Sequence, residues 1–94
     1  MHKIINIDFE SEIEFRQQME EHADIIHNNT LYGIDESFNK DEDNVVVAFL
    51  NGDSIMAIPK EEWLSNLDNT LTYFISTEEY EKCTEVKQLI DKLS

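Results

Sequence analysis

The sequence predicts an α+β fold: a small antiparallel sheet packs against helices, and the chain ends in an antiparallel helical hairpin. Three observations predict this class. Asn51-Gly52 separates two apolar runs, which is the pattern of a β-hairpin. Ser11 and Glu14 open a segment with helical periodicity. Residues 60–94 carry two apolar stripes at helical spacing, with a short break between them.

The N-terminal part is expected to form a strand and then a helix. Residues 3–9 alternate so that Ile5, Ile7 and Phe9 share one face of a strand. Ser11 can accept a hydrogen bond from the third helical N–H, and Glu14 can reach back to Ser11, which makes a capping box. A helix over about residues 12–27 follows from the spacing of Phe15, Met19, His22, Ala23 and Ile26.

Residues 28–44 are rich in Asn, Asp, Gly and Ser and show no sustained period, so we expect a structured loop with a short strand near 31–34. Residues 45–50 and 54–58 are then the two strands of a hairpin. Asn51 and Gly52 both tolerate the positive φ that the central residues of a type I′ turn require. Pro59 ends the second strand and can open the next helix.

The last third is expected to form two helices. The first, over residues 60–75, carries Trp63, Leu64, Leu67, Leu71, Phe74 and Ile75 on one stripe. Residues 76–79, Ser-Thr-Glu-Glu, fit a second capping box. The second helix carries Tyr80, Cys83, Val86, Ile90 and Leu93, and the short link predicts antiparallel packing. The chain is expected to be one domain over 1–94, with this hairpin (60–94) following a strand-helix-loop-hairpin part (1–59).

Residues 67–93 resemble the UVR motif, a helical hairpin found in the UvrB and UvrC repair proteins, in the ClpC chaperone and in its McsA partner. Tyr80-Glu81, Ile90 and Leu93 match that pattern. Cys83-Thr84 stand where two alanines are usual, and residues 86–88, Val-Lys-Gln, stand where Leu-Arg-Asp is usual. The resemblance implies protein binding, hairpin against hairpin. The alternative is that the same stripe is core, with the hairpin lying on the sheet. In overall style the chain also resembles small acidic accessory proteins of large tailed phages.

Charge is the strongest compositional signal. The chain has 21 Asp and Glu against 7 Lys and Arg, a formal net charge of -14. Such a surface repels nucleic acid and anionic membranes, so its expected partners are basic protein surfaces. The alternative is that the acidity only keeps a small protein in solution. The first residues do not fit a signal peptide and no stretch approaches a membrane span, so we expect a cytoplasmic protein.

The sequence offers no catalytic or metal-binding pattern, and we expect a protein that is not an enzyme and has no cofactor. His22 and His27 are five residues apart and do not share a helix face. The acidic run from Asp35 fails as a calcium loop, because Lys40 and Val46 occupy the positions of the required Gly and Glu. With one Cys in the chain, no internal disulfide can form.

Two binding hypotheses follow. In the first, carboxylates imitate nucleic acid phosphates and block a nucleic-acid-handling protein, whose basic surface they occupy. The carriers would be Glu12, Glu20, Glu21, Asp24, Asp35, Glu36, Asp41, Glu42 and Asp43. In the second, the chain is a UVR-like adaptor or oligomerisation module, with a homodimer as one form. Its apolar contacts would be Tyr80, Cys83, Val86 and Ile90.

Overall fold

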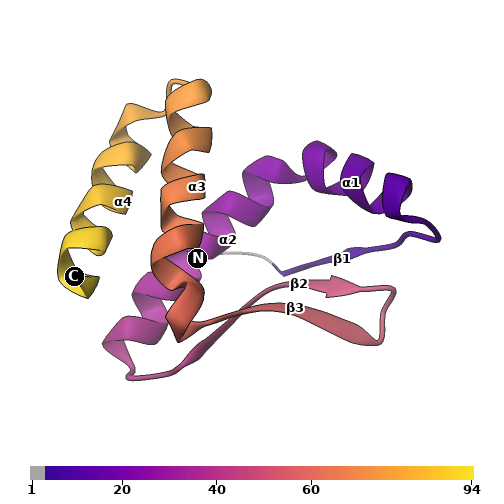
Figure 1. The fold of residues 1–94 in the computed structure, drawn as a ribbon, viewed down its shortest axis with the longest axis horizontal. Helices are drawn as coiled ribbons and strands as arrows, with labels where there is room; N and C mark the ends of the chain where they lie inside the picture. Colours follow the sequence, from indigo (N-terminus) through magenta and orange to yellow (C-terminus); the bar gives the residue numbers. More distant parts are fainter. Residues whose placement is uncertain (1–3) are drawn as a thin grey trace.

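The computed structural model describes residues 4–94. The elements follow in the order β1 (Ile5–Ile7), α1 (Glu12–Glu21), α2 (Ala23–Asn39), β2 (Asn44–Leu50), β3 (Ser54–Pro59), η1 (Lys60–Glu62), α3 (Trp63–Ser76) and α4 (Tyr80–Leu93). The predicted α+β class is confirmed (Figure 1). The start of the expected first strand, at Lys3, lies outside the described residues.

The three strands form one sheet in the order β1-β2-β3. β2 and β3 pair antiparallel, which confirms the hairpin, but β1 pairs parallel to β2, with Ile5 opposite Ala48. The expectation of a wholly antiparallel sheet was therefore wrong at β1. The reason is the connection, because α1 and α2 carry the chain back along the sheet before β2 begins (Figure 1).

The turn of the hairpin forms for the predicted reason. Asn51 has φ 51° and Gly52 has φ 75°, and the N–H of Asp53 donates to the carbonyl of Leu50 at 3.3 Å. The turn is also tied to the end of β1. The Asn51 side chain accepts from the N–H of Phe9 at 2.8 Å, and the N–H of Gly52 donates to the Asn6 side chain at 2.8 Å.

A β-bulge at Val47 places two consecutive residues of β2 in two different apolar clusters. Val46 pairs with Ala57 and Ala48 pairs with Met56, so Val47 has no partner of its own in the register. Val47 and Ala48 are consequently both buried, against the alternation of a regular strand. Val47 joins the larger apolar cluster around Trp63, whereas Ala48 joins a smaller one with Ile7 and Ile26.

The largest departure from expectation is α2. Residues 28–44 were expected to be a loop with a short strand, but residues 28–39 continue a helix and only 40–43 are irregular. The predicted helix over 12–27 is broken at His22, which separates α1 from α2. The buried face of α2 does have helical spacing, but with small and polar residues at most of its positions. These buried residues are Ile26, Asn29, Thr30, Leu31, Gly33, Ile34 and Ser37.

The polar groups on this face have partners inside the fold. The Asn29 amide donates to the carbonyl of Val47 at 3.0 Å, and the Thr30 hydroxyl donates to the carbonyl of Ile26 at 2.9 Å. A Cβ on Gly33 would lie 2.5 Å from Cγ1 of Val45, so glycine is what lets α2 approach β2. Hydrogen bonds and close backbone approach, rather than apolar periodicity, hold this helix on the sheet.

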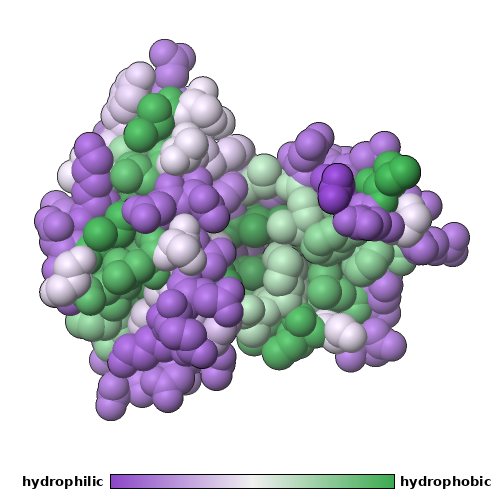
Figure 2. Space-filling model, viewed as in Figure 1, coloured by the Kyte–Doolittle hydropathy of each residue, from purple (hydrophilic) through white to green (hydrophobic). Residues whose placement is uncertain are grey.

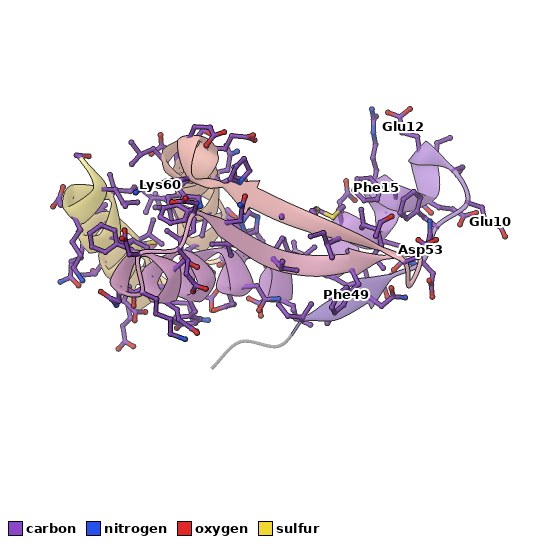
Figure 3. All side chains as sticks on the ribbon, turned by 90° about the horizontal axis from the view of Figure 1, so that it is seen from below. Glu10, Glu12, Phe15, Phe49, Asp53 and Lys60 are labelled. Atoms are coloured by element: carbon purple, nitrogen blue, oxygen red, sulfur yellow. The ribbon has the colours of Figure 1, made fainter. Side chains whose placement is uncertain are left out.

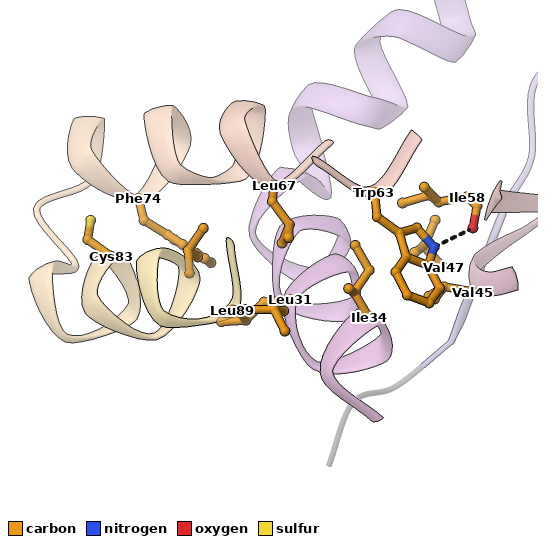
Figure 4. Packing of buried hydrophobic residues seen from close by; sticks show 11 residues of the cluster. Leu31, Ile34, Val45, Val47, Ile58, Trp63, Leu67, Phe74, Cys83 and Leu89 are labelled. Atoms are coloured by element: carbon orange, nitrogen blue, oxygen red, sulfur yellow. Dashed lines mark hydrogen bonds between the residues drawn. The ribbon is translucent and has the colours of Figure 1, made fainter. Parts of the chain in front are cut away.

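The helical hairpin is confirmed, and α3 and α4 run antiparallel (Figure 1). It packs on α2 as well as on the sheet. Phe74, Val86 and Leu31 share one cluster, and Trp63 donates from Nε1 to the carbonyl of Ile58 at 3.0 Å (Figure 4). The core therefore lies where α2, the hairpin and the first half of β2 meet.

Half of the first expected capping box forms. Ser11 Oγ accepts from the N–H of Glu14 at 3.2 Å, although the Glu14 carboxylate accepts from Glu10 rather than Ser11. The second box, at residues 76–79, was wrong. Ser76 belongs to α3, and Glu79 precedes α4 without a side-chain cap. The link is instead a Schellman motif: the N–H of Glu79 donates to the carbonyl of Phe74 at 2.9 Å, the N–H of Glu78 donates to the carbonyl of Ile75 at 3.1 Å, and Glu78 has φ 60°.

Candidate binding surfaces

The acidic side chains lie on the outside of the fold. None of the 21 acidic residues is buried, and all are exposed except Asp35 and Glu79, which are half-buried. Among the described residues, ion pairs hold four of them: Glu12, Asp35, Glu36 and Glu79. Most of the negative charge therefore faces solvent without a basic neighbour, where it can act on an approaching partner.

The nine acidic residues predicted as partner contacts do not form one patch. One group lies on and just after α1, and the other surrounds the C-terminal end of α2. Asp24 and Asp35, the nearest members of the two groups along the chain, lie 11 residues apart on α2, which is about 16–17 Å along the helix axis. The first group is Glu12, Glu20, Glu21 and Asp24, and the second is Asp35, Glu36, Asp41, Glu42 and Asp43. The loop that the sequence predicts over residues 28–44 would not fix this separation, whereas the helix does.

The second group contains a basic residue that its neighbours hold in the charged form. Lys40 Nζ contacts a carboxylate oxygen of Glu36 at 2.8 Å. This hydrogen bond, with the added charge of Glu36 and Glu42, raises the pKa of Lys40. Lys40 thus offsets part of the negative charge at this end of α2, and both side chains of the pair stay largely exposed.

The four apolar residues predicted as partner contacts are divided by the fold. Cys83 and Val86 are 5% and 0% exposed and belong to the core, so they present no surface to a partner. Ile90 is half-buried and packs against the same cluster. Tyr80 alone is well exposed, at 61%, and Ile75 close to the same end of the hairpin is exposed as well.

A cleft that the sequence did not predict lies between α2, α3 and β3. Its volume is about 430 Å³, and Figure 2 shows the hollow in the middle of the molecule with hydrophobic walls. The walls and rim are formed by Met19, Glu20, Ala23, Ile26, His27, Thr30, Val47, Met56, Ala57, Ile58, Glu62, Asn66, Asn69 and Thr70. Because these residues are contributed by elements far apart in the chain, no local sequence pattern could have revealed the cleft.

The free edge of β3 borders this cleft. Met56, Ala57 and Ile58 are consecutive and all line it, although successive strand residues point to opposite faces. Val47 of β2 and Ile26 of α2 line the cleft as well, so it lies over the face of the sheet that α2 covers and reaches β3 at its border. β3 is the last strand in the sheet order, and no strand within residues 4–94 pairs with its outer side. The carbonyl of Ile58 is occupied by Trp63 Nε1.

His27 and Thr70 bridge the two helices at the wall of the cleft. His27 Nδ1 lies 2.8 Å from Thr70 Oγ1, and the imidazole stacks on Tyr73 with ring centroids 4.4 Å apart. Burial lowers the pKa of His27, and the nearby Asp24 carboxylate partly opposes this. Burial also raises the pKa of Tyr73. Thr70 is 1% exposed, so its hydroxyl cannot meet a substrate, and we interpret the pair as a support for the cleft wall.

The second exposed apolar feature is the outer face of the sheet. Phe49 and Ile55 are opposite each other in the β2–β3 register and are 43% and 55% exposed. Phe49, labelled in Figure 3, follows Ala48 along β2 and therefore points to the opposite face from Ala48, which packs with Ile26 of α2. Ile55 stands on β3, so this face continues to the strand edge that borders the cleft.

Among residues 4–94 there is no group of three His, Cys, Asp or Glu side chains arranged to hold a metal ion. Within the same range, every helix is too short or too polar to cross a lipid bilayer. Comparisons of this chain with family models, with curated proteins and with solved structures found no match.

Proposed function

We propose that this protein is a small, acidic, non-enzymatic binding module that occupies a basic surface of a nucleic-acid-handling protein and thereby inhibits or regulates it. The observation that carries the proposal is that none of the 21 acidic residues, which give the chain its net charge of -14, is buried in the fold. Charge of this size steers a basic partner into contact and rejects nucleic acid and anionic membranes. In this proposal the carboxylates take the place of phosphates.

The position of the acidic groups supports a broad contact rather than a small one. The groups at α1 and at the end of α2 are about 16–17 Å apart along the axis of α2, measured between Asp24 and Asp35. Basic surfaces that follow a nucleic acid backbone are extended as well, and they interact with many phosphates at once.

The experiment is a pull-down with the tagged protein from nuclease-treated cell lysate, at low and at high salt, with identification by mass spectrometry. We expect a basic, nucleic-acid-binding partner at low salt. It should be lost near 1 M salt, where the Debye length falls to about 3 Å. A partner that stays bound at high salt would contradict the proposal.

Variants in which acidic side chains are replaced by their neutral amides locate the contact. Each removes three negative charges, so the net charge of all three variants is the same. The α1-end variant is Glu20→Gln, Glu21→Gln and Asp24→Asn; the α2-end variant is Asp41→Asn, Glu42→Gln and Asp43→Asn. The control is Asp68→Asn, Glu85→Gln and Asp91→Asn, on exposed positions of α3 and α4. We expect weaker capture by one or both of the first two variants than by the control. Equal capture by all three would show that no acidic group has a specific role.

The alternative is a UVR-like adaptor or oligomerisation module, and one observation favours it. Tyr80 and Ile75 leave an apolar surface at the end of the hairpin, with exposures of 61% and 49%. The exposed surface is narrower than the resemblance implies, because Cys83 and Val86 are core residues.

This alternative is tested by Tyr80→Glu and Ile75→Glu, with Thr84→Glu on an exposed position as the control. Sedimentation velocity would report self-association. Loss of a dimer in the first two variants and not in the control would support the alternative. A monomer at all concentrations, or a dimer that all three variants keep, would exclude self-association through this surface.

A further inference from the structure

We infer that the cleft receives an extended segment of the partner protein, which adds to β3 as a fourth strand. Its apolar side chains enter the cleft, and its Lys or Arg side chains face Glu20 and Glu62. This inference rests on the proposed function, because a basic partner supplies the segment. Beyond that function, the ligand is an extended peptide and its binding site is the cleft beside β3.

The outer edge of β3 has no neighbouring strand within residues 4–94 and can pair with an added one. Apart from the carbonyl of Ile58, which accepts from Trp63 Nε1, the edge of β3 without a neighbouring strand offers N–H and C=O groups in the spacing of a β-strand, and an extended peptide is the ligand that satisfies them. The cleft borders this edge along Met56, Ala57 and Ile58. A peptide seated there would make main-chain hydrogen bonds on one side and side-chain contacts above them.

The walls of the cleft suit the apolar side chains of such a segment. Met19, Ala23, Ile26 and Met56 give it an apolar lining, and its volume of about 430 Å³ lies within the range of pockets that bury ligands. An added strand alternates its side chains, so every second one would enter the cleft. The others would lie beside Ile55, which is 55% exposed on the outer face of the sheet.

The charge of the rim selects the kind of segment. Glu20 and Glu62 are exposed at the cleft, and neither has an ion pair within the described residues. Asn66 and Asn69 on α3 add amide groups to the rim. A second copy of this chain could also pair along β3, but two chains of charge -14 repel each other. A basic segment gains from the same charge, and we therefore assign the cleft to it.

The probe is a fluorescein-labelled peptide, Lys-Lys-Val-Thr-Ile-Thr-Val-Lys-Lys, measured by fluorescence anisotropy against the full chain. Two analogues carry backbone N-methyl groups, one on both Thr residues and one on the two Val and the Ile. The N–H groups of alternate residues point to opposite edges of a strand, so only one analogue blocks the edge that pairs with β3. We expect a loss of about tenfold or more in affinity for one analogue and little change for the other.

Variants of the protein locate the peptide. Ala23→Trp fills the cleft, and Thr84→Trp is its control on an exposed position of α4. Glu20→Gln with Glu62→Gln lowers the rim charge, and Glu85→Gln with Asp91→Asn removes the same charge elsewhere. We expect loss of binding for the first member of each pair. Circular dichroism of each variant and amide chemical shifts of residues 55–58 on titration separate a lost site from a lost fold.

Three results would overturn the inference: no binding of the probe at about 1 mM, equal binding of the two N-methyl analogues, or binding that Ala23→Trp leaves unchanged. The proposed function is judged separately by the pull-down. If Ala23→Trp still captures a salt-sensitive basic partner, the cleft is not the site and the proposed function stands. If the probe binds the cleft but no basic partner is captured, the cleft stands and the proposed function fails.

Discussion

Replacing Gly33 with alanine tests how α2 is held against the sheet. Gly33 lies in the middle of α2, on the face toward β2, where a Cβ would stand 2.5 Å from Cγ1 of Val45. Carbon atoms in packed interiors are normally about 3.5–4.0 Å apart. Val45 is 4% exposed and its side chain is stiff at χ1, so the helix and strand would have to separate.

Two opposing effects decide the size of the change. Alanine in place of glycine inside a helix stabilises it by about 1 kcal/mol. Forcing a methyl group into a packed contact costs about 1–3 kcal/mol. We therefore expect Gly33→Ala to lower the free energy of unfolding by about 1 kcal/mol, against the direction of helix propensity.

A double-mutant cycle with Val45 isolates the contact. Val45→Ala removes Cγ1 and alone should cost about 2 kcal/mol, because it deletes two buried methyl groups and leaves a small cavity. In that background, Gly33→Ala should stabilise by about 1 kcal/mol, because only the helix propensity remains. The coupling between the two changes is then about 2 kcal/mol.

The measurement is urea unfolding followed by circular dichroism, for the wild type, both single variants and the double variant. Equal m-values would show that the four proteins unfold between comparable states. A Gly33→Ala variant that is more stable than the wild type would refute the reasoning, since it would mean that α2 does not lie as close to β2 as the structure places it.

Three further predictions concern the C-terminal turn of α3, the N-cap of α1 and the titration of His27. Glu78→Gly should raise the free energy of unfolding by about 0.5–1 kcal/mol, because Glu78 adopts φ 60° at the end of α3, where glycine carries no steric cost. A lower free energy of unfolding, measured by urea denaturation, would contradict this. Ser11→Ala should lower it by about 1 kcal/mol, because the N–H of Glu14 loses its acceptor, and an unchanged value would show that this cap contributes nothing. The third prediction is for His27, whose pKa is lowered by burial: stability should fall as the pH drops below about 6.5 and through the lowered pKa, because the unfolded chain binds the proton first. Urea midpoints between about pH 8 and pH 5 should show this slope in the wild type and a flatter one in His27→Asn, and equal slopes would contradict it.

Some elements of the fold can be predicted from the sequence alone, and others cannot. The hairpin at Asn51-Gly52 and the cap at Ser11 follow from local backbone chemistry, which needs no distant partner. The α3–α4 hairpin follows from two apolar stripes that are wide enough to read without tertiary information. For the binding surfaces, the exposure of the acidic residues also follows from their type, because unpaired carboxylates are rarely buried.

Tertiary structure decided the rest. α2 is a helix because Asn29 finds the carbonyl of Val47 and Gly33 fits against Val45, and neither partner can be identified from the sequence around them. Cys83 and Val86 became core because α2 supplies a surface for the hairpin, and the cleft exists because residues of α1, α2, α3 and β3 meet around it in the fold. Local chemistry determines which segments can turn or coil, whereas burial and hydrogen-bond satisfaction depend on contacts between segments that only the assembled fold brings together.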